Sequence, residues 1–323
     1  MNLYNIKKPI LKHLVTYQKI LTNAIKSDVP LLNNILNYLE EEKGKQIRPM
    51  FVIFSAGLCG NINITTYRAA AMIELLHTAS LLHDDVVDNA EERRGKKTIN
   101  NIWQNKIAIL VGDFLVSKGI LLGIENKDFN IISLLVKAGY EMSEGELLQI
   151  EKSISLNITE NDYFNIITKK TGILIASCCS CGAVSVNAPE NKINAMYEFG
   201  KYAGIAFQIR DDILDLEKKI NSGKHHGNDI KEKKLTLPLI YMLSNTSEKH
   251  RQKIINSIKN HKQNPEKINE IIDMVKNSTG IDYAQTKLNE YQNKAMNILE
   301  QFNDNTFKKL LQKLLIYNSS REG

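Results

Sequence analysis

Apolar residues recur at close to the 3.6-residue helical period along most of the 323-residue chain. No segment alternates apolar and polar positions as a half-buried strand would. Helix starts can be placed at Asp28-Val29-Pro30, at Thr65-Thr66 in a helix running to about Asn89, and at Thr159-Glu160. The pattern predicts an all-α fold, a single-domain bundle of roughly ten or more helices.

Composition adds a broad class to this prediction. Hydrophobic residues make up 43% of the chain and are spread evenly, so we expect one domain over residues 1–323 with one large core. The net charge is +6, but basic and acidic residues alternate, as in Lys231-Glu232-Lys233-Lys234. This pattern is typical of a solvated surface, and nucleic-acid binding is not expected.

Three features favour a cytoplasmic protein. Residues 1–12 are polar and do not resemble a signal peptide. The longest apolar stretch, Ile107 to Gly123, contains Asp113 and Lys118, so it is interpreted as too short and too charged to span a bilayer. Cys178, Cys179 and Cys181 stand among small residues and are interpreted as core thiols of a reducing compartment.

Two acidic clusters lie in otherwise apolar helical stretches, Asp84-Asp85-Val86-Val87-Asp88 and Asp211-Asp212-Ile213-Leu214-Asp215. Residues four apart share a helix face, so each cluster presents a pair of carboxylates together. Unpaired carboxylates on apolar helices are costly. Two such clusters facing each other would suit Mg²⁺, which takes oxygen ligands and accepts phosphate oxygens as further ones. The expected substrate is a diphosphate.

Each acidic cluster is followed by a basic loop that contains glycine. Asn89 to Lys97 includes Arg93-Arg94-Gly95, and Asn221 to Lys234 includes Lys224, two histidines and a run of lysines. Cations beside a metal site can bind the phosphate oxygens that the metal leaves unsatisfied. Beyond Leu235 the sequence is helical and lysine-rich, without candidate chemistry.

These segments resemble the trans-isoprenyl diphosphate synthase (polyprenyl synthetase) family, and in particular its long-chain members. His77 to Asp88 with Arg93-Arg94-Gly95 resembles the first aspartate-rich motif, and Phe207 to Asp215 resembles the second. The further matches, in family order, are Gly44-Lys45-x-x-Arg48-Pro49, Lys170-Thr171, Gly223-Lys224-x-x-Gly227-x-Asp229 and Lys234-x-Thr236-Leu237-Pro238. Two departures are Lys43 for a usual glycine and Leu235 for a usual proline. The resemblance implies an isoprenoid synthase fold around a deep central cavity.

The resemblance also implies roles for individual residues. Isopentenyl diphosphate would be bound by Lys45, Arg48, His77 and Arg94. The allylic diphosphate would be bound by Arg93, Lys170, Thr171, Gln208, Lys224 and Lys234. Mg²⁺ would be held chiefly by Asp84, Asp88 and Asp211, with Asp85, Asp212 and Asp215 in support. Gln208, three residues before Asp211, and His77, seven before Asp84, are predicted to share a face with those carboxylates. A homodimer is a further expectation from the family.

Charge then suggests the reaction. Stabilising the departing diphosphate lets the allylic carbon–oxygen bond ionise, and isopentenyl diphosphate attacks the cation. The growing chain would pass Ser80 and Leu76 along the helix that carries Asp84. Because Ala79 and Ser80 are small, growth is predicted to reach a deeper floor at Leu76, Ile73 or Met72. A long polyprenyl diphosphate for a quinone side chain, passed to a membrane enzyme, is the expected product.

Four alternatives stay open at this point. The chain could make short products such as farnesyl or geranylgeranyl diphosphate. A terpene cyclase would share the ionisation step but would not need a second diphosphate site. A metal-dependent phosphohydrolase could use His83-Asp84, although His77 and His83 are too close in sequence for its usual ligands. The chain could also be the non-catalytic partner of a heteromeric synthase. Trp103, Asp113 and Gln149 are interpreted as structural or as supporting the site, without a direct role.

Overall fold

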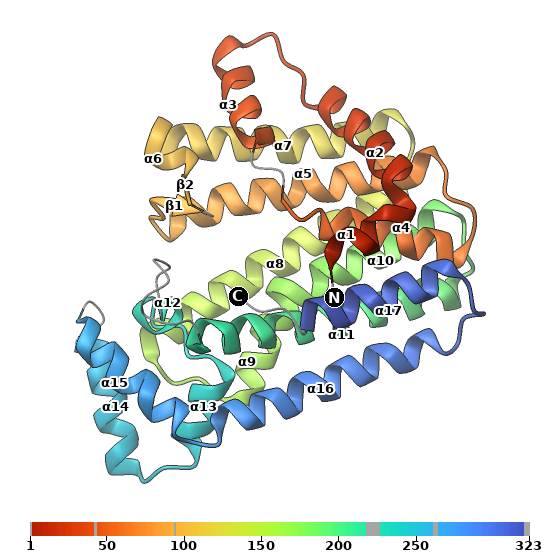
Figure 1. The fold of residues 1–323 in the computed structure, drawn as a ribbon. Helices are drawn as coiled ribbons and strands as arrows, with labels where there is room; N and C mark the ends of the chain where they lie inside the picture. The colour runs from red at the N-terminus through yellow and green to blue at the C-terminus, as the bar shows by residue number, and fades with distance from the viewer. Residues whose placement is uncertain (1, 42–43, 94, 218–226, 261–263, 320–323) are drawn as a thin grey trace.

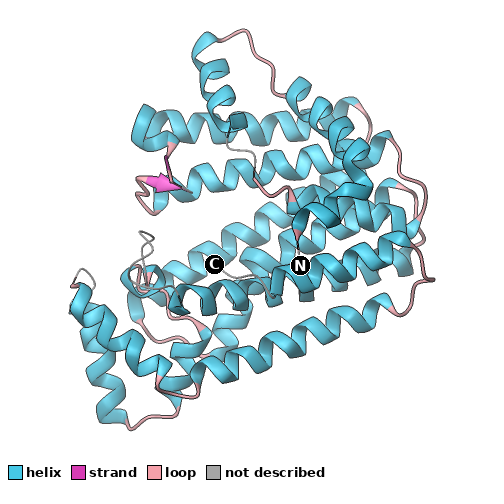
Figure 2. Cartoon of the chain, in the orientation of Figure 1, coloured by secondary structure: helices cyan, strands magenta, loops and turns pink. Residues whose placement is uncertain are grey.

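The computed structural model describes residues 2–41, 44–93, 95–217, 227–260 and 264–319. Helices account for nearly all of this part of the chain (Figure 2). Its only strands are β1 (Glu92–Arg93) and β2 (Lys96–Lys97), an antiparallel pair in the loop after the first acidic cluster. The predicted all-α class is therefore confirmed.

The helices follow one another through short connections. In chain order they are α1 Leu3–Lys7, η1 Lys8–Ile10, α2 Leu11–Ala24, α3 Pro30–Glu41, α4 Ile47–Cys59, α5 Ile64–Val87, α6 Ile99–Trp103, α7 Asn105–Glu125, α8 Phe129–Ser155, α9 Glu160–Ile167, the π-helical η2 Thr168–Gly172, α10 Ile173–Ser185, α11 Glu190–Glu217, α12 Asn228–Lys231, α13 Leu237–Ser244, α14 Glu248–Asn260, α15 Pro265–Lys276, α16 Gly280–Leu299 and α17 Thr306–Ser319. The short helix α12 lies inside a segment that the sequence predicted to be a loop.

Local capping explains where the functional helices begin. The Asn63 side chain accepts from the backbone N–H groups of Thr65 and Thr66, and the Thr66 hydroxyl in turn accepts from the Asn63 N–H. This capping box starts α5 one residue before the predicted Thr65. Thr159 and Asp162 form the same reciprocal pair at the start of α9. Both helix starts are thus determined by residues within one turn.

The arrangement is a layered bundle (Figure 1). Helix α5 packs on α7, α10 packs on both α4 and α11, and α11 packs on α16. The segment α12 to α15 gathers at the end of the bundle where α11 finishes. This topology brings the C-terminal ends of α5 and α11, which carry the two acidic clusters, to the same end of the molecule.

Helix α10 is buried on almost every side and explains the run of small residues. A Cβ on Gly182 would stand 2.3 Å from the backbone oxygen of Val52 in α4, and one on Gly200 of α11 would stand 2.5 Å from that of Ile175. Such close approaches leave no room for larger side chains. Cys178, Cys179 and Cys181 are fully buried and free, as predicted for core thiols.

Helix α7 corrects one prediction. The helix covers 21 residues, Asn105–Glu125, and by length and composition it could cross a membrane, so the stretch was wrongly judged too short and too charged. One third of its most apolar window is buried, against α5 among other elements. A single helix of this kind is also typical of the core of a bundle, and we interpret α7 as a packing helix with one uncovered apolar face.

Candidate active site

The first acidic cluster forms the C-terminal end of α5. Asp88 caps the helix, and its N–H donates to the Asp84 carbonyl oxygen at 2.8 Å. Carboxylates in the last turn of a helix are repelled by the negative end of the helix dipole. The position is therefore unfavourable for the helix itself, which supports a functional reason for the cluster.

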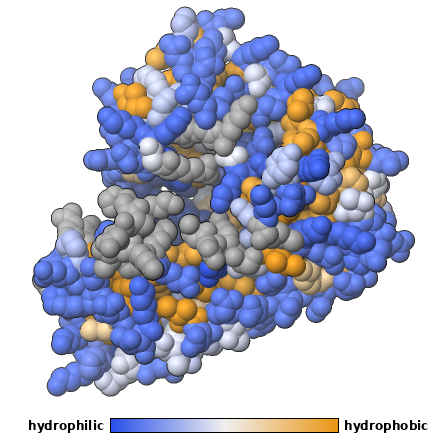
Figure 3. Space-filling model, in the orientation of Figure 1, coloured by the Kyte–Doolittle hydropathy of each residue, from blue (hydrophilic) through white to orange (hydrophobic). Residues whose placement is uncertain are grey.

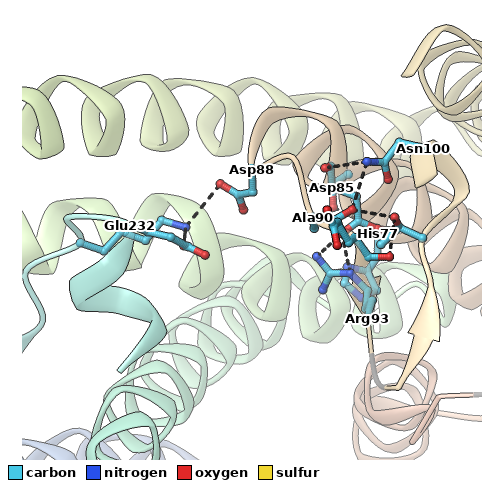
Figure 4. A network of polar contacts seen from close by, with 11 residues as sticks. His77, Asp85, Asp88, Ala90, Arg93, Asn100 and Glu232 are labelled. Carbon is cyan, nitrogen blue, oxygen red and sulfur yellow. Dashed lines mark hydrogen bonds and ion pairs between the residues drawn. The ribbon is translucent and has the colours of Figure 1, made fainter. Parts of the chain in front are cut away.

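The hairpin after α5 is tied back to this cluster. Arg93 lies 2.7–2.8 Å from the buried Asp85 carboxylate through both Nε and a terminal nitrogen (Figure 4). The Asn100 amide donates to the carbonyl oxygens of Asp85 and Ala90, and the Thr98 hydroxyl donates to that of Ala90 at 2.6 Å. Arg93 is thus held at the cluster. Arg94, its predicted neighbour in the site, lies outside the described residues.

Asp84 points toward charged groups of α8 and η2. Burial raises the pKa of Asp84 to about 6; Lys170 opposes this, while Glu146 and Asp88 add to it. Lys170 Nζ lies 2.5 Å from a Glu146 oxygen and 3.4 Å from Gln149 Oε1. Glu146, which the sequence did not single out, and Gln149, interpreted from sequence as structural or supporting, therefore hold Lys170 beside the first cluster.

The π-helical turn η2 determines the directions of the Lys169 and Lys170 side chains. Residues Thr168–Gly172 follow α9 directly, and the wider turn places Lys169 near Glu141 and Glu144, whereas Lys170 faces Glu146. Single π-helical turns within α-helices occur frequently at functional sites.

The second acidic cluster lies on α11 and is deeply buried. Asp212 is 4% exposed and Asp215 8%, and Asp211 is half-buried. Asp212 accepts from the Tyr163 hydroxyl at 2.7 Å and from Gln208 Nε2 at 2.9 Å, and Gln208 Oε1 accepts from the Thr171 hydroxyl at 2.8 Å. Gln208 was predicted to share a face with the carboxylates of this cluster, and its amide donates to Asp212.

The segment after α11 reaches the first cluster through Lys234. Lys234 Nζ lies 2.5 Å from Glu232 and 3.6 Å from Oδ1 of Asp88, the residue that caps α5. Although burial lowers the pKa of Lys234, the neighbouring carboxylates Glu232, Asp88 and Asp229 raise it overall. Burial, followed by the charges of Asp212 and Asp215, raises the pKa of Asp229 well above its ordinary range.

A cavity of about 150 Å³ lies beside the second acidic cluster, lined by residues of α8, α9, η2, α11 and the segment 229–236. Its lining includes four of the predicted allylic-site residues, Lys170, Thr171, Gln208 and Lys234, together with Asp212 and the unpredicted Tyr163. The surface in Figure 3 is hollowed on the same side, between the part with α5 to α7 and the part with α12 to α15. Of the other two predicted cations of this group, Arg93 is held at the first cluster instead, and Lys224 lies outside the described residues.

The predicted isopentenyl diphosphate residues lie further along the bundle. Arg48 is in the first turn of α4 and close enough to Cys178 to oppose the rise in that thiol's pKa; His77 is buried on α5, and Lys45 is exposed just before α4. The Ser80 hydroxyl donates to the His77 carbonyl at 2.9 Å. Their convergence on one ligand stays a prediction.

The predicted chain-length residues divide between two faces of α5. Ala79 is fully buried in a cluster with Leu75 of α5 and Val111 and Leu115 of α7. Leu76 faces α8 instead, where a Cβ on Gly139 would lie 3.8 Å from Leu76 Cδ1. Ser80, one turn from both Leu76 and Asp84, is half-buried, and Ile73 and Met72 are buried in the main core.

The donor chemistry at this end of the bundle fits a hard divalent cation. No three His, Cys, Asp or Glu side chains converge within the described ranges as a preformed metal centre. Mg²⁺ does not require one, because it usually binds through one or two carboxylates, substrate phosphates and water. Asp84 and Asp88 on α5, with Asp211 and Asp215 on α11, offer such carboxylates from two sides.

Comparisons with known proteins agree with this geometry. The polyprenyl synthetase family model matches residues 29–275. An all-trans-nonaprenyl-diphosphate synthase (geranyl-diphosphate specific) of Rhodobacter capsulatus is 33% identical over 96% of this chain and 95% of its own. Heptaprenyl diphosphate synthase component 2 of Bacillus subtilis is 35% identical over 86% of this chain and 79% of its own.

A solved structure extends the likeness to three dimensions. A polyprenyl synthase from Caulobacter crescentus, crystallised with calcium and isoprenyl diphosphate, superposes with a TM-score of 0.93 at 30% identity and covers 100% of this chain and 98% of that one. The family match and the extent of these alignments lead to one conclusion: the chain belongs to the polyprenyl synthetase family.

Proposed function

We propose that this protein catalyses the head-to-tail (1'-4) condensation of isopentenyl diphosphate with an allylic diphosphate and repeats it to give a long-chain all-trans polyprenyl diphosphate. The observation that carries the proposal is the junction of the two aspartate motifs, where Lys234 reaches Asp88 and Lys170 lies beside Asp84. Carboxylates and lysines alternating around one cavity suit a metal-bound diphosphate.

Mg²⁺ is the proposed metal, held by Asp84, Asp88, Asp211 and Asp215 with Asp85 and Asp212 in support. When bound, it would neutralise charge on the departing diphosphate as a Lewis acid. The crystallised relative with calcium and isoprenyl diphosphate supports a divalent cation beside such a ligand.

The side chains around the cavity would bind and orient the allylic substrate. Lys170 and Lys234 would contact its diphosphate oxygens together with Arg93, Thr171, Gln208 and Lys224. Charge developing on the leaving group would then be stabilised by preorganised cations, which favours ionisation of the allylic bond. Since Lys170 is paired with Glu146 and Lys234 with Glu232, both are already oriented before the ligand arrives.

Isopentenyl diphosphate would occupy the second set, Lys45, Arg48, His77 and Arg94. Its double bond would attack the allylic cation, and the proton lost would pass to the released diphosphate. Water must be excluded, since it would capture the cation. The apolar side chains of α5 and α8 below Asp84, such as Leu76, would provide this exclusion.

Product length is proposed to be long rather than fifteen or twenty carbons. Ser80 and Leu76 lie successively along α5 from Asp84, and Gly139 leaves the facing surface of α8 without a side chain. A tail growing between these helices would meet little bulk near the metal. The product would serve a quinone side chain through a membrane enzyme.

A cytoplasmic homodimer is the proposed assembly. Helices α7 and α8 expose apolar side chains that a monomer would leave in water, among them Leu110 at 54%, Ile124 at 50%, Val136 at 53% and Tyr140 at 60%. Contiguous exposed apolar patches mark interaction surfaces. A second copy could cover them with the same face. The name of the Bacillus subtilis relative, component 2, leaves a heteromer as the competing arrangement.

The experiment is product analysis with the purified chain alone. Labelled isopentenyl diphosphate, farnesyl diphosphate and Mg²⁺ should yield allylic polyprenyl diphosphates longer than twenty carbons. A cyclic hydrocarbon would indicate a terpene cyclase, and farnesol with phosphate would indicate a hydrolase. Absence of product that is restored only by a second subunit would assign the chain to a heteromeric synthase. Each of these results would contradict the proposal.

A further inference from the structure

Tyr163 lies outside every motif that the sequence singles out, yet its hydroxyl reaches the second acidic cluster. The residue is in the first turns of α9, its side chain is 3% exposed, and its ring packs edge-on against Phe164 at 5.3 Å. The hydroxyl donates to Asp212 Oδ2 at 2.7 Å.

Asp212 connects Tyr163 to two further side chains, those of Gln208 and Thr171. Its other oxygen, Oδ1, accepts from Gln208 Nε2 at 2.9 Å, and Gln208 Oε1 accepts from the Thr171 hydroxyl at 2.8 Å. The chain of hydrogen bonds thus links α9, α11 and η2. Each bond uses a particular atom, which fixes the amide orientation of Gln208 and the hydroxyl direction of Thr171.

The chain of bonds ends at the cavity beside the second aspartate motif. Tyr163, Asp212, Gln208 and Thr171 all line it, together with Lys170. A site of this kind requires ligand-binding groups held by a supporting layer of hydrogen bonds, because misplacement of about 1 Å is costly for catalysis. Along this series of hydrogen bonds, Tyr163 is the residue furthest from Thr171, and its side chain carries no charge.

We infer that Tyr163 is a positioning residue of the diphosphate site: its hydroxyl orients Asp212 and, through it, Gln208 and Thr171 for the metal-bound allylic diphosphate. The inference rests on the proposed function, since that function supplies the ligand. This positioning role differs from a purely structural role, in which the Tyr163 hydroxyl would only satisfy a buried carboxylate and contribute to folding.

Tyr163→Phe tests the inference, and Tyr283→Phe is its matched control. The Tyr283 hydroxyl lies 2.8 and 3.0 Å from the two Glu160 oxygens, so the control also removes a hydroxyl–carboxylate bond to α9. Titration calorimetry with inorganic diphosphate and Mg²⁺ measures the affinity of the site for diphosphate without turnover. We expect Tyr163→Phe to weaken this binding about tenfold, the scale of one hydrogen bond to a charged group, and Tyr283→Phe to leave it unchanged.

Steady-state kinetics provide the second measurement. In Tyr163→Phe, the KM for the allylic diphosphate should rise about tenfold, the scale of one hydrogen bond to a charged group. The Mg²⁺ concentration that gives the half-maximal rate should rise by a similar factor. The KM for isopentenyl diphosphate should stay at the wild-type value. In an Asp212→Asn background, Tyr163→Phe should have almost no further effect on diphosphate affinity, because its partner is already altered.

Two results would overturn the inference. One is wild-type diphosphate affinity and allylic KM in a folded Tyr163→Phe protein that has lost only thermal stability. The other is full additivity of Tyr163→Phe and Asp212→Asn. A wild-type chain that neither binds diphosphate with Mg²⁺ nor transfers prenyl groups would instead refute the proposed function, so the two failures are distinguishable.

Discussion

Lys234 reaches across from the segment after α11 to α5, with its Nζ 3.6 Å from Asp88 Oδ1 and 2.5 Å from Glu232. Lys234 therefore links Asp88 of the first aspartate motif to the segment after α11, and it lines the same cavity as Asp212 of the second motif. Such an arrangement limits repulsion between the motifs and leaves a positive group facing the ligand cavity. In the proposed reaction, a diphosphate would compete with Asp88 for this lysine.

Replacing Lys234 with methionine should weaken the allylic site. Lys234→Met keeps the length of the side chain but removes the charge shared by Asp88 and Glu232. We expect the KM for the allylic diphosphate to rise about 10- to 100-fold, the range for a charge-assisted hydrogen bond. Lys231→Met, on the adjacent helix α12, is the control and should behave as wild type. An unchanged allylic KM in Lys234→Met would contradict the role of Lys234.

The two sets of cations should sort by substrate. Lys45→Ala and Arg48→Ala should chiefly raise the KM for isopentenyl diphosphate, whereas Lys170→Ala and Lys224→Ala should chiefly impair the allylic substrate. Initial rates with each substrate varied in turn provide the measurement. Equal effects of all four changes on both substrates would show that the pockets have been wrongly assigned.

Bulk on the α8-facing side of α5 should shorten the product. Ser80→Phe places a ring about one helical turn, roughly 5 Å, from Asp84, so the tail should stop near fifteen or twenty carbons. Leu76→Ala should leave products unchanged or longer. Chromatography of the dephosphorylated products distinguishes these outcomes, and an active Ser80→Phe enzyme with the wild-type distribution would exclude this channel direction.

Ala79→Tyr should act differently from Ser80→Phe. Ala79 is fully buried against Val111 and Leu115, so the ring would overpack the α5–α7 contact and cost about 1–3 kcal/mol of unfolding free energy. Thermal denaturation should show a lower Tm for Ala79→Tyr than for Ser80→Phe. Equal Tm values would indicate that α7 shifts to accommodate the ring. The ring at position 79 could then also extend toward the channel.

The buried thiols should resist alkylation in the folded protein. Burial raises the pKa of Cys178 to about 12 and that of the half-buried Cys59 to about 11, so little thiolate is present near pH 8. Mass spectrometry after iodoacetamide treatment should find Cys178, Cys179 and Cys181 unmodified until denaturant is added. Rapid native labelling of these three would contradict a close-packed α10.

Local signals made the helix framework predictable. Helix α5 was expected from Thr65 to about Asn89 and runs from Ile64 to Val87, because its N-terminal capping residues lie within one turn of each other. The long-range partners were not predictable. Tyr163 lies 49 residues from Asp212, and its helical spacing with Ile166 and Ile167 marks it only as a core residue; the packing of α9 against α11 brings Tyr163 and Asp212 together.

Helical register left open which carboxylate of the second cluster Gln208 would contact. On a helix, residues three and four positions away are both neighbours, so the sequence could not choose between Asp211 and Asp212 as its partner. The choice depends on Tyr163 and Thr171, which lie on other elements. Glu146 was missed in the same way, and Gln149 was interpreted as structural or supporting without a named partner. They lie one turn apart on α8, and that spacing acquired meaning only when Lys170 was found beside both.

The most direct test of the central claim is the rate of labelled isopentenyl diphosphate incorporation by Asp84→Ala and Asp211→Ala at saturating Mg²⁺. The two motifs act on one diphosphate in this account, so each change should lower turnover at least about a hundredfold, the scale of one lost electrostatic transition-state contact. The fold should persist, and Asp273→Ala on the exposed face of α15 should match wild type. Near-wild-type turnover in either Asp84→Ala or Asp211→Ala would contradict the account.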